Sequence, residues 1–223
     1  NIMKKVAIVT GSSRGIGYAI ARRLGRDGFR VVVSATGPQE KYEQVLAGLT
    51  ADGIEWRYIR CDIADHDSRL HLIEETVRQF GRIDVLVNNA GCGTTGNIGS
   101  SASPADVMRV VDLNVRALTM VTQTVVPFMT RGAKIINVSS IAAFCPTPRM
   151  TVYSASKAYV SAFTGGIADE LRPKGISVTA VCPGPMKTEF FDAAGDHDLF
   201  GNIPWCDPVK VVAGTIRAAK KGR

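Results

Sequence analysis

The sequence has 223 residues and a formal net charge of +7, with 45% hydrophobic and 21% charged residues. This length and composition are typical of one globular α/β domain with a sizeable core. No apolar run approaches the length of a membrane-spanning helix. Lysines and arginines are scattered and form no long block of like charge, so a solvated surface explains the positive charge better than a nucleic-acid-binding tract.

Five cysteines are spread along the chain, at Cys61, Cys92, Cys145, Cys182 and Cys206. Their number is odd, no Cys-x-x-Cys pair occurs, and no cysteine and histidine cluster has the spacing of a zinc site. We therefore expect free thiols in a reducing compartment, a cytoplasmic protein and no metal centre.

The first predicted strand, at 6–9, is a short apolar run rich in β-branched residues. It leads into a turn with Gly11, Gly15 and Gly17, after which apolar residues recur at helical spacing. This order is the context of a dinucleotide-binding fingerprint, because glycines let backbone N–H groups and the helix N-terminus approach a pyrophosphate. The spacing is Gly-x-x-x-Gly-x-Gly rather than Gly-x-Gly-x-x-Gly, so a purely structural turn is the alternative interpretation.

The second predicted strand, at 29–35, bears on the choice of cofactor. In many dinucleotide-binding folds an acidic residue near the end of this strand holds the adenosine ribose hydroxyls, which favours NAD. Here the stretch from Val33 to Gly37 contains no acid, and Arg14 in the glycine turn would lie close to a 2′-phosphate. We therefore expect NADP rather than NAD; the alternative is that Arg14 only faces solvent.

The later elements repeat the same alternation. Further strands are predicted at 56–60, 83–87, 133–138 and 176–182, and helices at 39–50, 66–80, 104–129, 153–172 and 209–220. Strands alternating with helices predict a parallel, doubly wound Rossmann-type sheet of order 3-2-1-4-5-6 with helices on both faces. No repeat or linker interrupts the pattern, so we expect residues 1–223 to form a single domain.

Polar and small residues follow the predicted strands. Asp62 could accept a hydrogen bond from the amino group of adenine, or could instead cap the next helix. Asn89, Ala90 and Gly91 follow the fourth strand, where small and amide side chains suit the approach of a ligand. Asn114 lies among apolar residues of the 104–129 helix, where a buried amide needs partners; a satisfied structural amide is the alternative.

Tyr153 and Lys157 are four residues apart in a predicted helix, so both side chains project from one face. A neighbouring ammonium favours phenolate and would lower the tyrosine pKa from its reference value of about 10, toward general acid–base work. For this pair alone, an ordinary amphipathic helix with an exposed lysine is the alternative.

Together these motifs resemble a classical short-chain dehydrogenase/reductase. The resemblance covers nearly the whole chain and rests on motifs in the family's order: Thr10 to Gly17, Asp62, Asn88 to Gly91, Asn114, Ser140, Tyr153 to Lys157, and Pro183 through Thr188.

The resemblance implies a role for each catalytic residue. Tyr153 would be the general acid in carbonyl reduction and the base in the reverse direction, and Lys157 would lower the Tyr153 pKa and bind the nicotinamide ribose. Ser140 would donate a hydrogen bond to the substrate oxygen. We choose Ser140 over Ser139 because the family places this serine thirteen residues before the tyrosine. Asn114 would hold a water that links Lys157 to solvent.

The same resemblance implies the cofactor contacts and an NADP(H)-dependent oxidoreductase that interconverts a ketone or aldehyde and an alcohol. The expected cofactor-binding residues are Gly11, Ser13, Arg14, Gly15, Ile16, Gly17, Thr36, Asp62, Ile63, Asn89, Ala90, Gly91, Tyr153, Lys157, Pro183, Gly184, Met186 and Thr188.

Family members usually form dimers or tetramers through two long helices, here 106–129 and 153–171, and we expect a homodimer or homotetramer. Val121, Val125, Val160 and Phe163 would suit such an interface, or could face the chain's own core. The family usually continues into a seventh strand and a short tail, whereas this sequence ends at Arg223. We expect either a short protein or a truncated chain, and base no oligomer contact on that tail.

Three narrower or competing hypotheses remain. The chain could be a 3-oxoacyl-[acyl-carrier-protein] reductase, with Arg131 and Lys174 docking an acidic carrier protein; the alternative is two solvated cations. A non-catalytic NADP-binding regulator should have lost one of the four catalytic positions, and all four are intact. A nucleic-acid-binding domain should interleave aromatic with basic residues, which this sequence does not do. The irregular segment 189–205 is expected to select the substrate.

Overall fold

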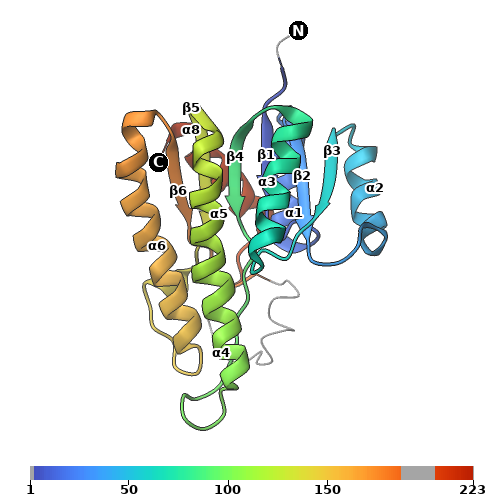
Figure 1. Ribbon diagram of the computed structural model, residues 1–223. Helices are drawn as coiled ribbons and strands as arrows, with labels where there is room; N and C mark the ends of the chain where they lie inside the picture. The colour runs from blue at the N-terminus through green and yellow to red at the C-terminus, as the bar shows by residue number, and fades with distance from the viewer. Residues whose placement is uncertain (1–2, 187–203, 223) are drawn as a thin grey trace.

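A six-stranded parallel sheet forms the centre of the molecule (Figure 1). The computed structural model describes residues 3–186 and 204–222. The strand order is β3-β2-β1-β4-β5-β6, so the predicted Rossmann-type order is confirmed. The strands are β1 (Val6–Val9), β2 (Arg30–Ala35), β3 (Trp56–Arg60), β4 (Ile83–Asn88), β5 (Met129–Val138) and β6 (Ser177–Val181).

Helices cover both faces of the sheet. One apolar core lies between the sheet and α3, α5 and α6, and a second lies between the sheet and α1, α2 and α8. Residues of β1 and β4 are buried throughout, because both their faces are covered. The helices are α1 (Gly15–Arg26), α2 (Glu43–Ala51), α3 (His66–Phe80), α4 (Pro104–Val111), α5 (Leu118–Val125), α6 (Thr151–Leu171) and α8 (Pro208–Lys221).

Local signals fix several helix ends. Asp65 and Ser103 cap α3 and α4, because each side chain accepts a hydrogen bond from a backbone N–H of the first turn. Asp207 caps α8 in the same way, ahead of Pro208. At the other end of α3, Gly81 takes a left-handed φ of 73°, which stops the helix at little steric cost.

The segment predicted as one helix at 104–129 is divided in the structure. A π-helical segment, η2 (Asp112–Ala117), lies between α4 and α5, and a short 3₁₀ turn, η3 (Val126–Phe128), follows α5. Such π segments are often found at functional sites, and this one contains Asn114. Pro127 lies in the turn that ends the helical region, so β5 begins at Met129 rather than at Ala133.

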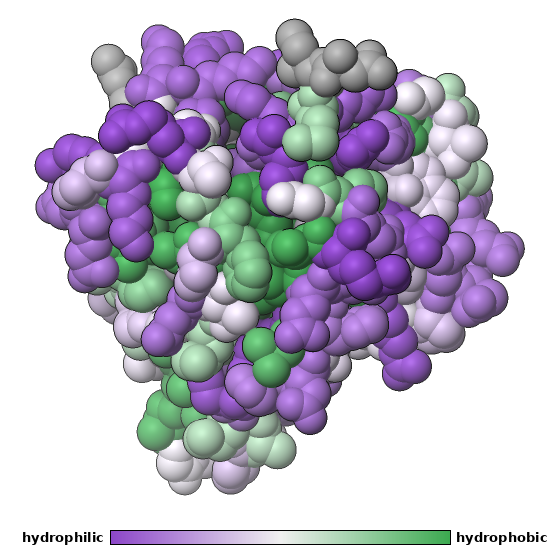
Figure 2. Space-filling model, turned by 45° about the horizontal axis from the view of Figure 1, so that its top comes forward, coloured by the Kyte–Doolittle hydropathy of each residue, from purple (hydrophilic) through white to green (hydrophobic). Residues whose placement is uncertain are grey.

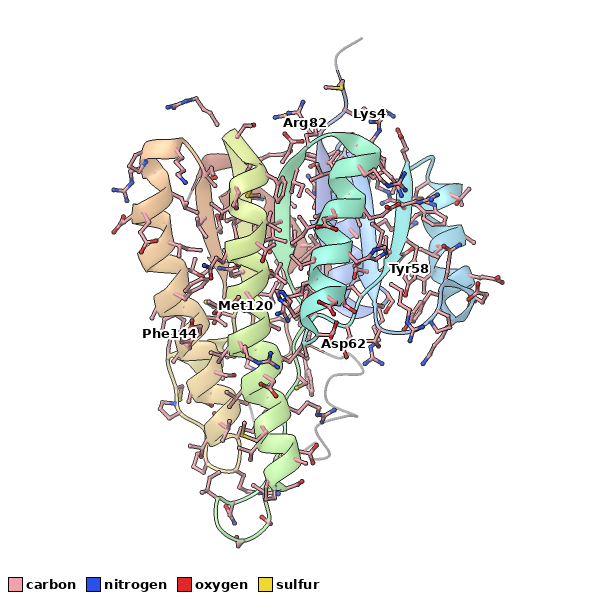
Figure 3. All side chains as sticks on the ribbon, viewed as in Figure 1. Lys4, Tyr58, Asp62, Arg82, Met120 and Phe144 are labelled. Atoms are coloured by element: carbon pink, nitrogen blue, oxygen red, sulfur yellow. The ribbon has the colours of Figure 1, made fainter. Side chains whose placement is uncertain are left out.

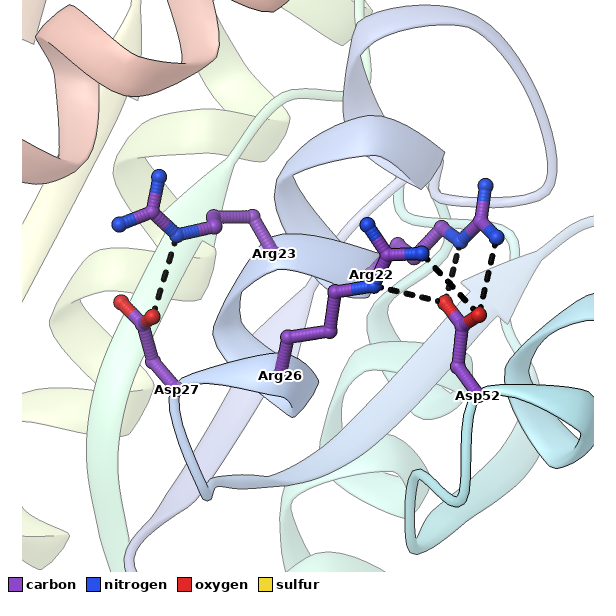
Figure 4. A network of polar contacts seen from close by, with 5 residues as sticks. All are labelled: Arg22, Arg23, Arg26, Asp27 and Asp52. Atoms are coloured by element: carbon purple, nitrogen blue, oxygen red, sulfur yellow. Dashed lines mark hydrogen bonds and ion pairs between the residues drawn. The ribbon is translucent and has the colours of Figure 1, made fainter.

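Ion pairs gather at the end of the sheet where the strands begin. The Asp52 carboxylate binds Arg22 and Arg26, and Asp27 binds Arg23, as Figure 4 shows. Figure 2 tilts this end toward the reader and shows hydrophilic side chains around an apolar area. We call this the amino edge. No helix among the described residues is long and apolar enough to span a bilayer.

Candidate active site

The predicted site residues gather at the opposite end, where the strands finish; we call it the carboxyl edge. In Figure 3, Asp62 lies at the lower ends of the strands, whereas Lys4 and Arg82 lie at the upper end. The strand order reverses beside β1, between β2 and β4, and ligands of open α/β sheets bind beyond the strand ends at such a switch point.

The glycine turn after β1 is shaped for close backbone approach. Gly11 and Gly15 have φ values of +61° and +56°, which favour glycine. A Cβ on Gly17 would lie 2.3 Å from Asn89 Nδ2 and 2.5 Å from the Gly11 carbonyl, so no side chain fits there. The turn therefore needs its glycines, and the start of α1 lies against the loop that follows β4.

Side chains bind this turn to the neighbouring strand ends. Asn89 Nδ2 donates to the carbonyls of Thr10 and Gly11, each at 2.9 Å. The Thr10 hydroxyl accepts from the backbone N–H groups of Asn89 and Ala90. Because the two N–H groups of the Asn89 amide are used by this turn, Asn89 shapes the glycine turn and does not offer its amide nitrogen to a ligand.

Tyr153 and Lys157 are both buried near the start of α6, with exposed fractions of 8% and 6%. Lys157 Nζ donates to the Val138 carbonyl at 2.8 Å and lies 5.7 Å from the centre of the Tyr153 ring. Tyr153 and Lys157 therefore project from the same face of α6, as their spacing predicts. The alternative of an exposed surface lysine is excluded, because Lys157 is buried.

The expected effect of Lys157 on the Tyr153 pKa was wrong for this structure. Burial raises the Tyr153 pKa to about 12, and a hydrogen bond from Ser140 offsets only part of that rise. Burial also lowers the Lys157 pKa to about 8, because the protein interior destabilises the charged ammonium relative to the neutral amine. The sequence spacing places the two groups together but carries no information about how deeply they are buried.

The two serines after β5 have different surroundings. The buried Ser139 hydroxyl donates to the Lys157 carbonyl at 2.8 Å and contacts the Ser161 hydroxyl at 2.9 Å. Ser140 is half-buried; its oxygen accepts from the Ala142 N–H at 3.2 Å, and its side chain hydrogen-bonds to Tyr153. Ser140 is therefore the serine that faces the tyrosine, and Ser139 anchors α6 to the sheet.

Asn114 joins the loop after β4 to α6. Its Oδ1 accepts from Cys92 N at 2.9 Å, and its Nδ2 donates to the Cys92 carbonyl at 2.8 Å and to Ser156 Oγ at 3.0 Å. Ser156 Oγ in turn donates to the Tyr153 carbonyl at 2.7 Å. A Cβ on Gly91 would lie 3.0 Å from Asn114 Oδ1 and 3.5 Å from Lys157 Nζ, so this glycine keeps space open beside the lysine.

The exit of β2 lies beside the glycine turn. Ser12 Oγ accepts from Ser34 N at 3.0 Å, and Ser12 N donates to the Ser34 carbonyl. The exposed Arg14 and Thr36 therefore lie on adjoining strand exits, and Ser13 is buried between the turn and the core.

Asp62 is exposed beyond β3 and does not cap α3, since Asp65 does so. Its Oδ1 accepts from Ala64 N at 3.0 Å, which makes a local turn, while the adjacent Ile63 is buried. The capping alternative for Asp62 is thus excluded, and the adenine contact stays a prediction.

The exit of β6 completes the edge. The Pro183 carbonyl accepts from Ile141 N at 3.0 Å, which brings this exit beside Ser140. A Cβ on Gly184 would lie 2.8 Å from Cys206 Sγ, and Met186 is buried. Thr188 and most of the predicted substrate loop, 189–203, lie outside the described residues.

The residues suggested for an oligomer interface divide into two groups. Val121, Val125 and Val160 are fully buried in the chain's own core, so they cannot form an interface. Phe163 is partly buried and stacks on Tyr159, with ring centres 5.7 Å apart. The helical periodicity alone could not separate these two faces.

Comparison with known proteins agrees with this geometry. Residues 5–198 match the family model for short chain dehydrogenase. The chain is 39% identical over 197 residues to 3-oxoacyl-[acyl-carrier-protein] reductase FabG of Staphylococcus aureus, which covers 87% of this chain and 80% of that protein. It is 38% identical over 193 residues to human dehydrogenase/reductase SDR family member 4, covering 85% of this chain and 68% of that one.

Solved structures show the same fold. A short chain dehydrogenase from Burkholderia cenocepacia in complex with NADP superposes with a TM-score of 0.87 at 31% identity, covering 98% of this chain and 92% of that one. A variant of actinorhodin polyketide ketoreductase with NADPH gives a TM-score of 0.86 at 30% identity, covering 96% and 89%. The fold and the family model define a dinucleotide-binding oxidoreductase. The chain belongs to the short-chain dehydrogenase/reductase family.

Two residues of this edge are not among the predicted site residues. Ser156 links Asn114 to Tyr153, and the backbone of Cys92 holds the Asn114 amide. Ser156 lies inside the Tyr153 to Lys157 motif and Cys92 directly follows the Asn88 to Gly91 motif, but their contacts depend on where α6 meets the loop after β4. Polar residues next to motif residues are the one clue that could have identified them.

Proposed function

We propose that the chain is an NADP(H)-dependent oxidoreductase that interconverts a ketone or aldehyde and an alcohol. The observation that carries this proposal is the grouping of the half-buried Ser140 with the buried Tyr153 and Lys157 at the carboxyl edge. A hydroxyl pair and a buried ammonium without an acidic partner suit the binding of a carbonyl oxygen and a dinucleotide ribose.

In carbonyl reduction, Tyr153 would donate its proton to the substrate oxygen and Ser140 would stabilise the negative charge that develops there. A neutral phenol is the required form for this direction, and the raised Tyr153 pKa keeps it protonated in the free protein. The bound nicotinamide supplies the hydride. In alcohol oxidation the proton moves in the reverse direction, to the Tyr153 oxygen.

Lys157 would hold the nicotinamide ribose and replace the proton that Tyr153 loses. Its lowered pKa, about 8, means that it releases a proton more readily than an exposed lysine does. Both N–H groups of the Asn114 amide are occupied, so a relay water at this residue would bind the second lone pair of Oδ1 or a backbone group.

The preference for NADP over NAD rests on charge at the exit of β2. No acid occupies 33–37, and Arg14 is exposed on the neighbouring glycine turn. Structural relatives bound to NADP and NADPH support this preference.

The relative from Staphylococcus aureus favours a narrower proposal, that the substrate is an acyl thioester carried by an acidic protein. The structure brings Arg131 and the Arg172–Lys174 turn together, since the Arg131 side chain would contact a Cβ on Gly175. This cluster lies at the amino edge, about 30 Å from Tyr153 along α6 at 1.5 Å per residue. The docking cluster and Tyr153 therefore lie at opposite ends of α6.

The test is a panel of ketones, aldehydes and acetoacetyl thioesters, assayed by consumption of NADPH and, in parallel, of NADH. We expect turnover with at least one carbonyl class and faster turnover with NADPH. Failure to reduce an acetoacetyl thioester would exclude the carrier-protein proposal, and an absence of turnover with every carbonyl would contradict the general one.

A further inference from the structure

The exit of β2 is held by side chains from the edge strand β3. The Tyr58 hydroxyl hydrogen-bonds to the Gly37 carbonyl and lies 3.1 Å from that of Ala35. Arg60 Nε donates to the Thr36 carbonyl at 2.8 Å. All three carbonyls of this turn therefore have a partner from β3, which fixes the turn in place.

The contact with Thr36 uses only Nε of Arg60 and leaves the two terminal amino groups of the guanidinium available. The side chain is exposed, and within residues 3–186 and 204–222 its terminal amino groups make no hydrogen bond or ion pair. Most arginines of the described chain are instead bound to carboxylates: Arg22, Arg23, Arg26, Arg30, Arg78, Arg82, Arg109, Arg116 and Arg172. Arg60 thus combines a fixed position with a guanidinium that is not neutralised.

The nearby acids leave this guanidinium available. Glu75 shares a shallow groove with Arg60 but is already bound to Arg78 and Gln79. Asp62 accepts from Ala64 N, and the exposed Glu40 makes no ion pair with Arg60 among the described residues.

Arg14 lies on the other side of the same turn. It is exposed on the exit of β1, and its side chain too has no hydrogen-bond or ion-pair partner in the described part of the chain. The exposed Thr36 follows β2, which lies between β1 and β3 in the sheet, so Arg14, Thr36 and Arg60 lie at the ends of three adjacent strands. Two guanidinium groups without acid partners and a hydroxyl at neighbouring strand ends are groups that suit a phosphate.

We infer that Arg60 is a second cation of the site for the adenosine 2′-phosphate, acting with Arg14 and Thr36. This inference rests on the proposed preference for NADP. Arg60 would contact the phosphate through its terminal amino groups while Nε keeps the turn in position. It is a specificity-determining residue and takes no part in proton or hydride transfer.

The test is calorimetric titration of the protein with 2′,5′-ADP and, separately, with 5′-ADP, which lacks the 2′-phosphate. We expect the unmodified protein to prefer 2′,5′-ADP. Arg60→Gln should weaken 2′,5′-ADP binding roughly tenfold or more, as expected for one charge-assisted bond, with little change for 5′-ADP. Arg57→Gln is the matched control, since Arg57 is an exposed arginine on the same strand without an ion pair among the described residues.

The outcomes separate the inference from the proposed function. Equal binding of both nucleotides by the unmodified protein contradicts the NADP preference itself. A retained preference in Arg60→Gln overturns the role of Arg60 and leaves the preference to Arg14. An equal loss in Arg57→Gln also overturns it, because general charge attraction would then explain the effect. The inference is supported if the ratio of kcat/KM with NADPH to kcat/KM with NADH falls in Arg60→Gln and not in Arg57→Gln.

Discussion

The two edges of the sheet use charge in opposite ways. At the amino edge, arginines and lysines are matched with carboxylates: Arg82 with Asp84, Lys4 with Glu55, and Lys220 with Asp27. At the carboxyl edge, Lys157 has only the Val138 carbonyl as a hydrogen-bond acceptor, and Arg14 and Arg60 have no acid partner among the described residues. A charge that is already paired with an acid is less available to a ligand than a charge without an acid partner.

This contrast predicts that substitutions at the two edges have opposite effects. Substitutions at the carboxyl edge should lower activity with little loss of stability, because charged groups without an acid partner do not stabilise the folded state. Changes at the amino edge should lower stability and leave the activity of the folded protein unchanged. The substitutions at Lys157, Asp84 and Ser156 below are assessed for both quantities.

The largest expected effect is that of Lys157→Met at the carboxyl edge. Turnover should fall by on the order of 10²–10⁴, as for the loss of a general acid–base group. The free energy of unfolding should stay equal or increase, because a buried ammonium is replaced by an apolar chain of similar length. Urea unfolding and steady-state kinetics measure the two effects. A protein that loses stability and activity together would contradict the comparison.

At the amino edge, Asp84→Ala should lower the free energy of unfolding by about 2–4 kcal/mol. The Asp84 carboxylate is 9% exposed, binds Arg82, and accepts from Val6 N at 2.8 Å. Its loss leaves a buried strand N–H and a guanidinium without a partner. The kcat of the folded fraction should be unchanged, and a kcat fall beyond about threefold would show that the two edges are coupled.

The pH dependence of stability should carry the signature of Lys157. The Lys157 pKa is about 8 in the folded protein and has the ordinary value of 10.5 in the unfolded chain. Below pH 8 the buried amine is charged, and the whole destabilisation is present. Above about pH 10.5 the amine is neutral in both states, and the destabilisation is absent. Relative to Lys157→Met, the unmodified protein should therefore gain stability as pH rises from 8 to 10.5, by on the order of 3 kcal/mol. A flat difference between the two unfolding curves over this range would contradict the buried ammonium.

The smallest expected effect is that of Ser156→Ala, which breaks the link from Asn114 to Tyr153. We expect a stability loss of about 1 kcal/mol and a kcat fall of roughly tenfold, with KM for the cofactor unchanged. Ser154→Ala is the matched control, because Ser154 is also buried on α6 but its Oγ accepts from Thr147 N instead. Equal effects of the two substitutions would show that Ser156 contributes only packing and that its link from Asn114 to Tyr153 does not affect turnover.

The sequence identified the strand order and the positions of the motif residues, because buried strands and glycine turns leave direct signals in residue pattern. It did not identify the π-helical segment around Asn114 or the early start of β5, since no residue type marks a π turn. It also could not predict that burial raises the Tyr153 pKa, or that Val121, Val125 and Val160 face the core. These features depend on packing between distant segments.

Arg60 illustrates the same limit at the end of β3. Its residue type is visible in the sequence, but its contact with Thr36 spans two strands that are paired only in the fold. Asp65 depends instead on a local contact. Its carboxylate accepts a hydrogen bond from Ser68 N, three residues on, and this bond makes Asp65 rather than Asp62 the cap of α3.

The most direct test of the central claim, that the carboxyl edge performs carbonyl reduction through Tyr153, is a single-turnover measurement on Tyr153→Phe. NADPH oxidation is followed after mixing with a carbonyl that the unmodified protein reduces, and NADPH affinity is measured by fluorescence titration. We predict a rate loss on the order of 10²–10⁴ with NADPH affinity changed less than about twofold. A rate close to that of the unmodified protein would contradict the assignment of Tyr153 as the proton donor.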